Sequence, residues 1–151
     1  MRYMNILDCS IADGSGVRVA LYVSGCNHCC EGCHNKESWD CSAGKLFTQE
    51  KKEELFKLLD RYYIDGITLT GGDPLIENNL KECTALCKEI KERFPKKTIW
   101  LYTGYVYEDV SDLEIMNYVD VVVDGPFIQE QRDITLPFRG SSNQRIIKVR
   151  G

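Results

Sequence analysis

The sequence concentrates soft metal ligands in one short segment. Residues 25–35 read GCNHCCEGCHN and hold four cysteines and two histidines in eleven positions. Thiolates and imidazoles are ligands of zinc and of iron–sulfur clusters, so this segment indicates metal or redox chemistry. The spacing allows two ligand patterns. One is a pair of adjacent C-x2-C units, and the other is a C-x3-C-x2-C triad of Cys26, Cys30 and Cys33 that leaves Cys29 aside.

Each pattern suits a different metal centre. A structural zinc site needs four tetrahedral ligands, and its ligand pairs normally join two distant segments. Four ligands within residues 26–33 would connect no distant segments of the chain. The backbone at the adjacent Cys29 and Cys30 would also have to bend sharply for both to bind one ion. A fully ligated ferredoxin-type cluster needs a fourth, remote cysteine, for which Cys9 and Cys41 are candidates. Three thiolates on a four-iron cluster would leave one iron open, as catalytic zinc keeps a position open for water or substrate.

The composition excludes several classes of protein. The chain has 151 residues, a net charge of −4 and 43% hydrophobic residues, as expected for one soluble domain with its own core. An acidic chain lacks the basic surface that nucleic acid requires. No apolar run of membrane-spanning length and no signal peptide pattern is present. We therefore expect a cytoplasmic protein without nucleic-acid or membrane partners, whose eight cysteines favour metal or redox chemistry over disulfides.

Alternating strands and helices should position the ligands. We expect strands at residues 17–24, 67–70, 98–103, 119–123 and 145–149, and helices at residues 48–62, 79–94 and 108–117. Thr48 is the expected N-cap of the first helix, and Cys83 and Cys87 lie on the apolar stripe of the second, so we assign both cysteines to the core. This alternation predicts an α/β fold with a parallel sheet. A closed eightfold barrel usually needs about 200 residues or more, so we expect an open, partial parallel β/α barrel of about five to six strands.

Four features of the sequence directly follow expected strands. They are the cysteine segment, GGDP at 71–74, TG at 103–104 and DGP at 124–126. Because the carboxyl ends of parallel strands meet at one edge, where ligands bind in such folds, the sequence predicts a single site built from all four.

The C-x3-C-x2-C spacing after the first of these strands resembles the signature of radical S-adenosylmethionine (SAM) enzymes. Five segments are similar, in order, to the activating proteins of anaerobic ribonucleoside-triphosphate reductase: VSGCNHCCEGCHNKESW, LTGGDPL, YTGY, VVVDGPF and RGSSNQ. The resemblance covers essentially the whole chain. It implies a single radical SAM domain over residues 1–151, with a partial barrel of the radical SAM type. It also implies an enzyme that reductively cleaves SAM at a 4Fe–4S cluster and generates a glycyl radical on the reductase.

The resemblance further implies which residues hold the cofactors. Cys26, Cys30 and Cys33 would bind the cluster as the catalytic set, and SAM would occupy the open iron. Gly32, Cys33 and His34 would contact SAM largely through their backbone.

For the remaining motifs the resemblance implies contacts with the methionyl part of SAM. Gly71 and Gly72 would receive its amino group, with Asp73 close to the ammonium. Thr103 and Asp124 would bind its carboxylate or a monovalent cation, although an ordinary strand-terminal cap is the alternative for both.

Partners are implied in the same way. RGSSNQ would contact SAM or a partner, with Arg139 as the candidate for an anionic group, and a solvated loop is its alternative. The reductase would be the protein substrate and a flavodoxin-like protein the electron donor, in a homodimer or a complex with a dimeric reductase. Three alternatives stay open: an activase of another glycyl-radical enzyme such as pyruvate formate-lyase, a non-enzymatic iron–sulfur electron carrier with a fourth cysteine ligand, and a zinc-stabilised interaction module.

Overall fold

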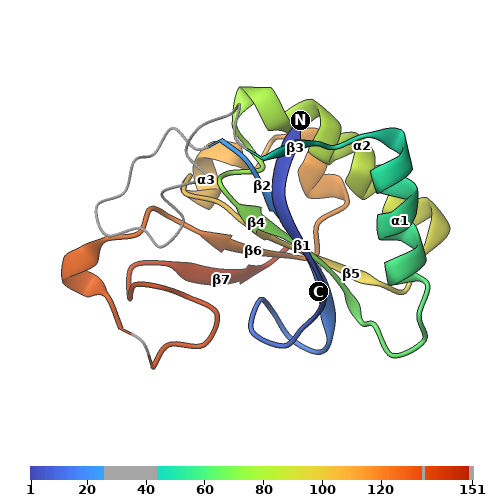
Figure 1. Ribbon diagram of the computed structural model, residues 1–151. Coiled ribbons are helices and arrows are strands. Elements are labelled where there is room, and N and C mark those ends of the chain that lie inside the picture. The colour runs from blue at the N-terminus through green and yellow to red at the C-terminus, as the bar shows by residue number, and fades with distance from the viewer. Residues whose placement is uncertain (26–43, 134, 150–151) are drawn as a thin grey trace.

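The structure, a computed structural model, describes residues 1–25, 44–133 and 135–149 of the chain. Its strands are β1 (Arg2–Ser10), β2 (Arg18–Val23), β3 (Lys45–Leu46), β4 (Gly66–Gly71), β5 (Thr98–Tyr102), β6 (Val121–Asp124) and β7 (Arg145–Lys148). Its helices are α1 (Gln49–Leu59), α2 (Glu77–Arg93) and α3 (Tyr107–Val110), with short 3-10 helices η2 (Glu114–Asn117) and η3 (Gln129–Gln131). The strands form one sheet in the order β3-β1-β2-β4-β5-β6-β7, shown in Figure 1.

The centre of the sheet is parallel and its edges are antiparallel. β2, β4, β5 and β6 pair in parallel, whereas β1 runs antiparallel to β2 and β7 runs antiparallel to β6. The parallel strands are almost continuously buried, as strands covered on both faces are. The α/β class and an open sheet are thus confirmed. The expectation of five to six parallel strands is wrong, because the described sheet has seven strands with antiparallel edges.

The two differences have physical reasons. β1 and β3 were not predicted. β1 lies near the edge of the sheet and shows no clean alternation of buried and exposed residues, and β3 is only two residues long. β7 was predicted as a strand, but it follows β6 without an intervening α-helix. A parallel return needs a crossover of a dozen or more residues, usually a helix, whereas an antiparallel return needs only a loop.

Helices α1 and α2 cover one face of the sheet and form the main core with it (Figure 1). Thr48 caps α1 as predicted, because its hydroxyl accepts a hydrogen bond from the Lys51 amide at 3.1 Å. On α2, Cys83 and Cys87 are buried in this core, which confirms their assignment. No helix in the described part of the chain is long and apolar enough to cross a membrane.

Two predicted helices differ in extent. The helix expected at residues 48–62 ends at Leu59, and the helix expected at residues 108–117 is divided into α3 and η2. The break falls at Ser111 and Asp112, residue types that compete for backbone hydrogen bonds and disfavour a helix interior.

The opposite face of the sheet has a small second cluster built on Trp100, Val121 and Val123, with Phe138 packed against it. Beside it, Arg18 is fully buried and donates to the hydroxyls of Thr68 and Thr98 at 2.9 Å each. Burial lowers the pKa of Arg18 to about 10. The buried guanidinium of Arg18 therefore holds the N-terminal end of β2 against β4 and β5.

Candidate active site

The carboxyl ends of the parallel strands β2, β4, β5 and β6 meet at one edge of the sheet, as the sequence predicts. We call this edge the strand-end edge. The Gly72 amide donates to the Val23 carbonyl at 2.8 Å, which joins the end of β4 to the end of β2. The Thr103 amide donates to the Val123 carbonyl at 3.0 Å, which joins the ends of β5 and β6. The cysteine segment starts directly after Gly25 at this edge. Cys26, Cys29, Cys30, Gly32, Cys33, His34 and Cys41 lie outside the described residues.

The turn after β4 requires both of its glycines. Gly71 has a φ of +100°, a conformation that residues with a side chain rarely adopt. A Cβ on Gly72 would lie 2.3 Å from the Gly25 carbonyl oxygen, well inside contact distance. The backbone of this turn therefore packs directly against the backbone that leads into the cysteine segment. Within the described residues the Gly72 carbonyl accepts no hydrogen bond, so it offers an acceptor that suits an ammonium group.

Asp73 is buried and connects three of the strand ends. Its amide donates to the Gly25 carbonyl at 2.7 Å, and its carboxylate accepts from the Thr103 hydroxyl at 2.9 and 3.0 Å. The same carboxylate accepts from the amides of Leu75 and Gly104, both at 2.9 Å. Asp73 and Thr103 therefore hold the ends of β2, β4 and β5 together, and we call the residues with this role the frame of the site. Their expected contacts with SAM stay predictions.

Asn79 is a residue of the site that sequence reasoning missed. It lies in the first turn of α2, is 2% exposed, and its side-chain amide donates to the carbonyls of Ser24 at 2.8 Å and Asp73 at 3.0 Å. It thus holds the residue before Gly25 against the glycine turn. A signal was present, because Asn79 stands four residues before Cys83 on the buried stripe of α2, where an apolar side chain would be expected.

Asp124, at the end of β6, is also buried, and its partners come from the neighbouring elements. It accepts from the Tyr107 amide at 2.8 Å and from the Arg145 guanidinium at 2.6 and 3.1 Å. Arg145 also donates to Glu108 at 2.7 Å. Hydrogen bonds to Asp124 and then to Glu108 raise the pKa of Arg145, and the bond from Arg145 lowers the pKa of Glu108. Arg145 was predicted only as part of a strand.

The RGSSNQ segment largely bonds to itself and to the loop after β6. The Gln144 side chain accepts from the amides of Gly140 and Ser141 at 2.8 and 3.2 Å and donates to the Gly125 carbonyl at 3.0 Å. Arg139 donates to the Gln144 carbonyl at 3.3 Å, but its Nε is buried without a hydrogen-bond partner among the described residues. A free, buried donor of this kind is available to an anionic group.

Comparison with known proteins adds a second line of observation. The family model of the "4Fe-4S single cluster domain" matches residues 12–147. The anaerobic ribonucleoside-triphosphate reductase-activating protein of Enterobacteria phage T4 is 47% identical over 146 residues, which cover 97% of this chain and 93% of that protein. The proteins of the same name from Vibrio cholerae and Salmonella typhi are 41% and 39% identical, over 97% and 99% of this chain and 97% and 100% of their own.

The chain belongs to the anaerobic ribonucleoside-triphosphate reductase-activating proteins. The match to a 4Fe–4S domain spans the cysteine segment and the three other strand-end motifs. The resemblance drawn from the five sequence segments is therefore confirmed, and with it the presence of a 4Fe–4S domain.

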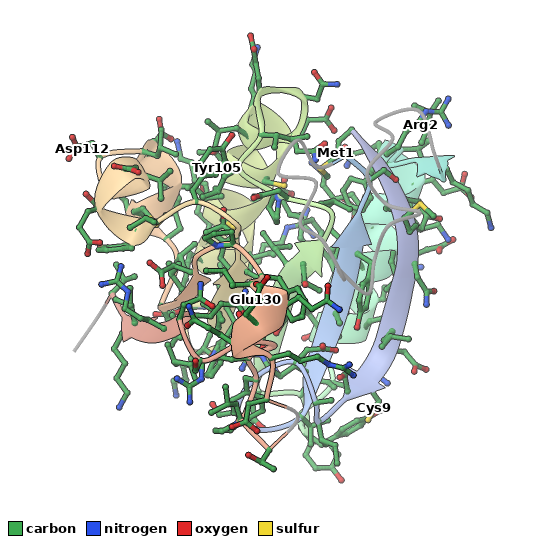
Figure 2. The ribbon with its side chains drawn as sticks, turned by 90° about the vertical axis from the view of Figure 1, so that its left-hand side faces the viewer. Met1, Arg2, Cys9, Tyr105, Asp112 and Glu130 are labelled. Atoms are coloured by element: carbon green, nitrogen blue, oxygen red, sulfur yellow. The ribbon has the colours of Figure 1, made fainter. Side chains whose placement is uncertain are left out.

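The three cysteines among the described residues, Cys9, Cys83 and Cys87, are poorly placed as cluster ligands. Register pairs Tyr3 of β1 with Val23 and Ser10 with Arg18, so Cys9 lies at the edge opposite Gly25. Figure 2 shows Cys9 at one end of β1 and Tyr105, which follows the end of β5, well away from it. Cys83 and Cys87 are buried in the core, and burial raises the pKa of both thiols.

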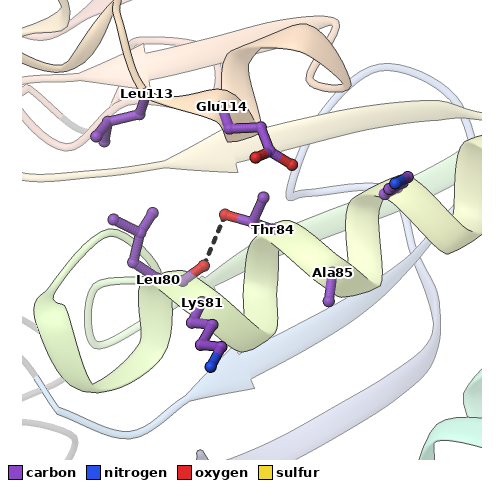
Figure 3. Close-up of a pocket in the computed structure, with 7 residues that line it drawn as sticks. Leu80, Lys81, Thr84, Ala85, Leu113 and Glu114 are labelled. Atoms are coloured by element: carbon purple, nitrogen blue, oxygen red, sulfur yellow. Dashed lines mark hydrogen bonds between the residues drawn. The ribbon is translucent and has the colours of Figure 1, made fainter.

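A hollow of about 400 Å³ lies between α2 and η2 (Figure 3). It is lined by Leu80, Lys81, Thr84, Ala85, Lys88, Leu113 and Glu114. The Thr84 hydroxyl is already bonded to the Leu80 carbonyl at 2.7 Å. None of the predicted site residues that the structure describes lines the hollow.

Proposed function

We propose that this protein activates an anaerobic ribonucleoside-triphosphate reductase by generating a glycyl radical on it, with a 4Fe–4S cluster and SAM as cofactors. One observation carries the proposal. Gly25, which leads into the cysteine segment, accepts a 2.7 Å hydrogen bond from Asp73 of the glycine turn. The segment that would hold the cluster and the turn that would receive SAM therefore start from a shared contact, in a chain 47% identical to an activating protein.

The cluster ligands in this proposal are Cys26, Cys30 and Cys33, which leaves one iron open. Gly32 and His34 contact SAM from the same segment. When bound, the cluster and SAM supply one-electron chemistry that removes a hydrogen atom from a glycine of the reductase. The protein's own task is to orient these groups and to exclude competing reactions.

The described residues support specific parts of this task. The Gly72 carbonyl, which accepts no hydrogen bond from the described residues, suits the methionyl ammonium with Gly71 beside it, and no side chain could fit between Gly72 and Gly25. Asp73 and Thr103 fix this turn to the end of β5. The Nε of Arg139, which has no partner in the described part of the chain, suits an anionic group such as a carboxylate. No acid–base pair is needed for hydrogen-atom removal.

The proposal includes the setting of the reaction. Residues 1–151 act as one radical SAM domain, whose open sheet is a partial barrel. The reductase is the protein substrate, a flavodoxin-like protein donates the electron, and the protein works as a homodimer or bound to a dimeric reductase in the cytoplasm. The names and coverage of the relatives support the reductase as the target.

The test is anaerobic reconstitution with iron and sulfide, followed by dithionite and SAM. Bound iron, 5′-deoxyadenosine and the glycyl radical signal on added reductase are measured for wild type, Cys30→Ser and Cys29→Ser. Cys9→Ser is the matched control, because Cys9 is exposed at the opposite edge of the sheet. Wild type, Cys29→Ser and Cys9→Ser should produce 5′-deoxyadenosine and the radical, and Cys30→Ser should produce neither.

A contrary result is equally clear. A wild-type protein that holds a full complement of iron and yields no 5′-deoxyadenosine would refute the radical reaction. Cys29 would then be a candidate fourth ligand, and the electron-carrier alternative would take its place.

A further inference from the structure

Asp124 is a buried carboxylate at the strand-end edge, where the sequence resemblance implies a carboxylate or a monovalent cation bound with Thr103. A buried carboxylate needs a compensating charge, because its desolvation is costly. The question is which cation supplies that charge.

Arg145 already occupies the positions that a cation would need. Register pairs Asp124 with Arg145 across β6 and β7. Oδ1 of Asp124 accepts from the Arg145 amide at 3.2 Å and from its Nε at 3.1 Å, while Oδ2 accepts from Arg145 Nη2 at 2.6 Å and from the Tyr107 amide at 2.8 Å. A carboxylate has about four acceptor positions, so these four bonds use all of them.

The other predicted ligand is engaged as well. The Thr103 hydroxyl donates to Asp73 and accepts from the Tyr105 amide at 3.1 Å. Glu108 is the other carboxylate bonded to Arg145, and it is exposed. Within residues 1–25, 44–133 and 135–149, no group of three His, Cys, Asp or Glu side chains is arranged to hold a metal ion. The residues at this position therefore do not fit a bound monovalent cation.

We propose that Arg145 is the built-in counter-ion of Asp124, so that this activating protein needs no monovalent cation at the strand-end edge. A guanidinium stays charged at every relevant pH, and its planar fork matches a carboxylate in a bidentate pair. Through Asp124, Arg145 also fixes the Tyr107 amide and with it the start of α3. Arg145 is thus a positioning residue for the end of β6.

The first test uses the thermal midpoint of the protein in KCl and in choline chloride at equal ionic strength. The wild-type midpoint should be the same in both salts. Arg145→Met should lower the midpoint in choline by about 10 °C, because it leaves a buried carboxylate unpaired, and KCl or added guanidinium should restore part of the loss. Lys148→Met is the matched control at the exposed far end of β7, and it should behave as wild type.

Two more variants separate charge from packing. Arg145→Lys keeps the cation and should be independent of potassium. The double variant Asp124→Asn with Arg145→Met removes both charges, so its midpoint should also be the same in both salts. A wild-type midpoint that rises in KCl, or an Arg145→Met midpoint equal in both salts and unchanged by guanidinium, would overturn the proposal.

The second test measures the dissociation constant of SAM for the reconstituted protein by equilibrium dialysis, and this readout alone rests on the proposed function. The wild-type constant should agree within twofold between the salts, whereas that of Arg145→Met should be at least fivefold larger in choline than in KCl. A twofold or smaller difference for Arg145→Met would count against the counter-ion role. If wild type binds no SAM in either salt, the proposed function fails, and the thermal test still decides the role of Arg145.

Discussion

Asn79→Ala tests the contact that holds the strand before the cysteine segment against the glycine turn. The variant removes a donor that reaches Ser24 O at 2.8 Å and Asp73 O at 3.0 Å from a side chain only 2% exposed. Removing a hydrogen-bond donor from a buried acceptor costs about 1–3 kcal/mol. With two carbonyls affected, we expect the free energy of unfolding to fall by about 2–4 kcal/mol. For a chain of this size that corresponds to a thermal midpoint lower by about 5–15 °C.

The assay is urea denaturation and thermal unfolding followed by circular dichroism, with Asn78→Ala as control. Asn78 is the preceding residue of the same helix and is exposed, so its substitution should change stability by less than about 0.5 kcal/mol. Asn79→Asp keeps the shape but faces two carbonyls with an acceptor, and at neutral pH it should be the least stable of the three. If Asn79→Ala and Asn78→Ala have the same urea and thermal midpoints, the role assigned to Asn79 is refuted.

Three further substitutions test other parts of the frame. Gly72→Ala would place a Cβ 2.3 Å from the Gly25 carbonyl, so equilibrium dialysis should show SAM binding at least tenfold weaker; unchanged affinity would contradict the close contact. Thr103→Val loses the hydroxyl bonds to Asp73 at 2.9 and 3.0 Å and should cost about 1–3 kcal/mol in urea denaturation, whereas Thr103→Ser should be nearly neutral; equal losses would argue against those bonds. Burial raises the pKa of Cys87 from 9.0 to about 12, so the folded state retains a proton that the unfolded state loses. The contribution of this thiol to the free energy of unfolding should therefore be constant below pH 9 and fall above it, by up to about 1.4 kcal/mol per pH unit until pH 12, and Cys87→Ala should reduce that slope.

The elements that the sequence predicted well are those with local signals. Thr48 marks the start of α1 through its own hydrogen bond to a residue three positions later. The positions of the glycine turn and of Thr103 at strand ends follow from short apolar runs that stop at glycine and polar residues. The convergence of these ends then follows from the geometry of parallel strands.

The residues that the sequence did not reveal depend on distant partners. Asn79 acts on Ser24, 55 residues earlier, and Arg145 acts on Asp124, 21 residues earlier. The place of Asn79 on the buried stripe of α2 marks it as unusual but does not reveal its partner. Arg145 leaves no such mark, since an arginine in a strand is an ordinary surface residue in most contexts. The direction of β7 was likewise missed, because RIIK has the same composition whether it runs parallel or antiparallel.

The antiparallel direction of β7 has a consequence for shortened versions of the chain. Because β7 runs back from the strand-end edge, its first residue, Arg145, lies at that edge, whereas a parallel β7 would deliver it to the opposite one. A residue that follows all five family segments in the sequence therefore completes this edge of the sheet. A chain that ended after Gln144 would retain all five family segments and still leave Asp124 without its guanidinium. Motif content alone thus does not show that a chain of this family carries the counter-ion of Asp124.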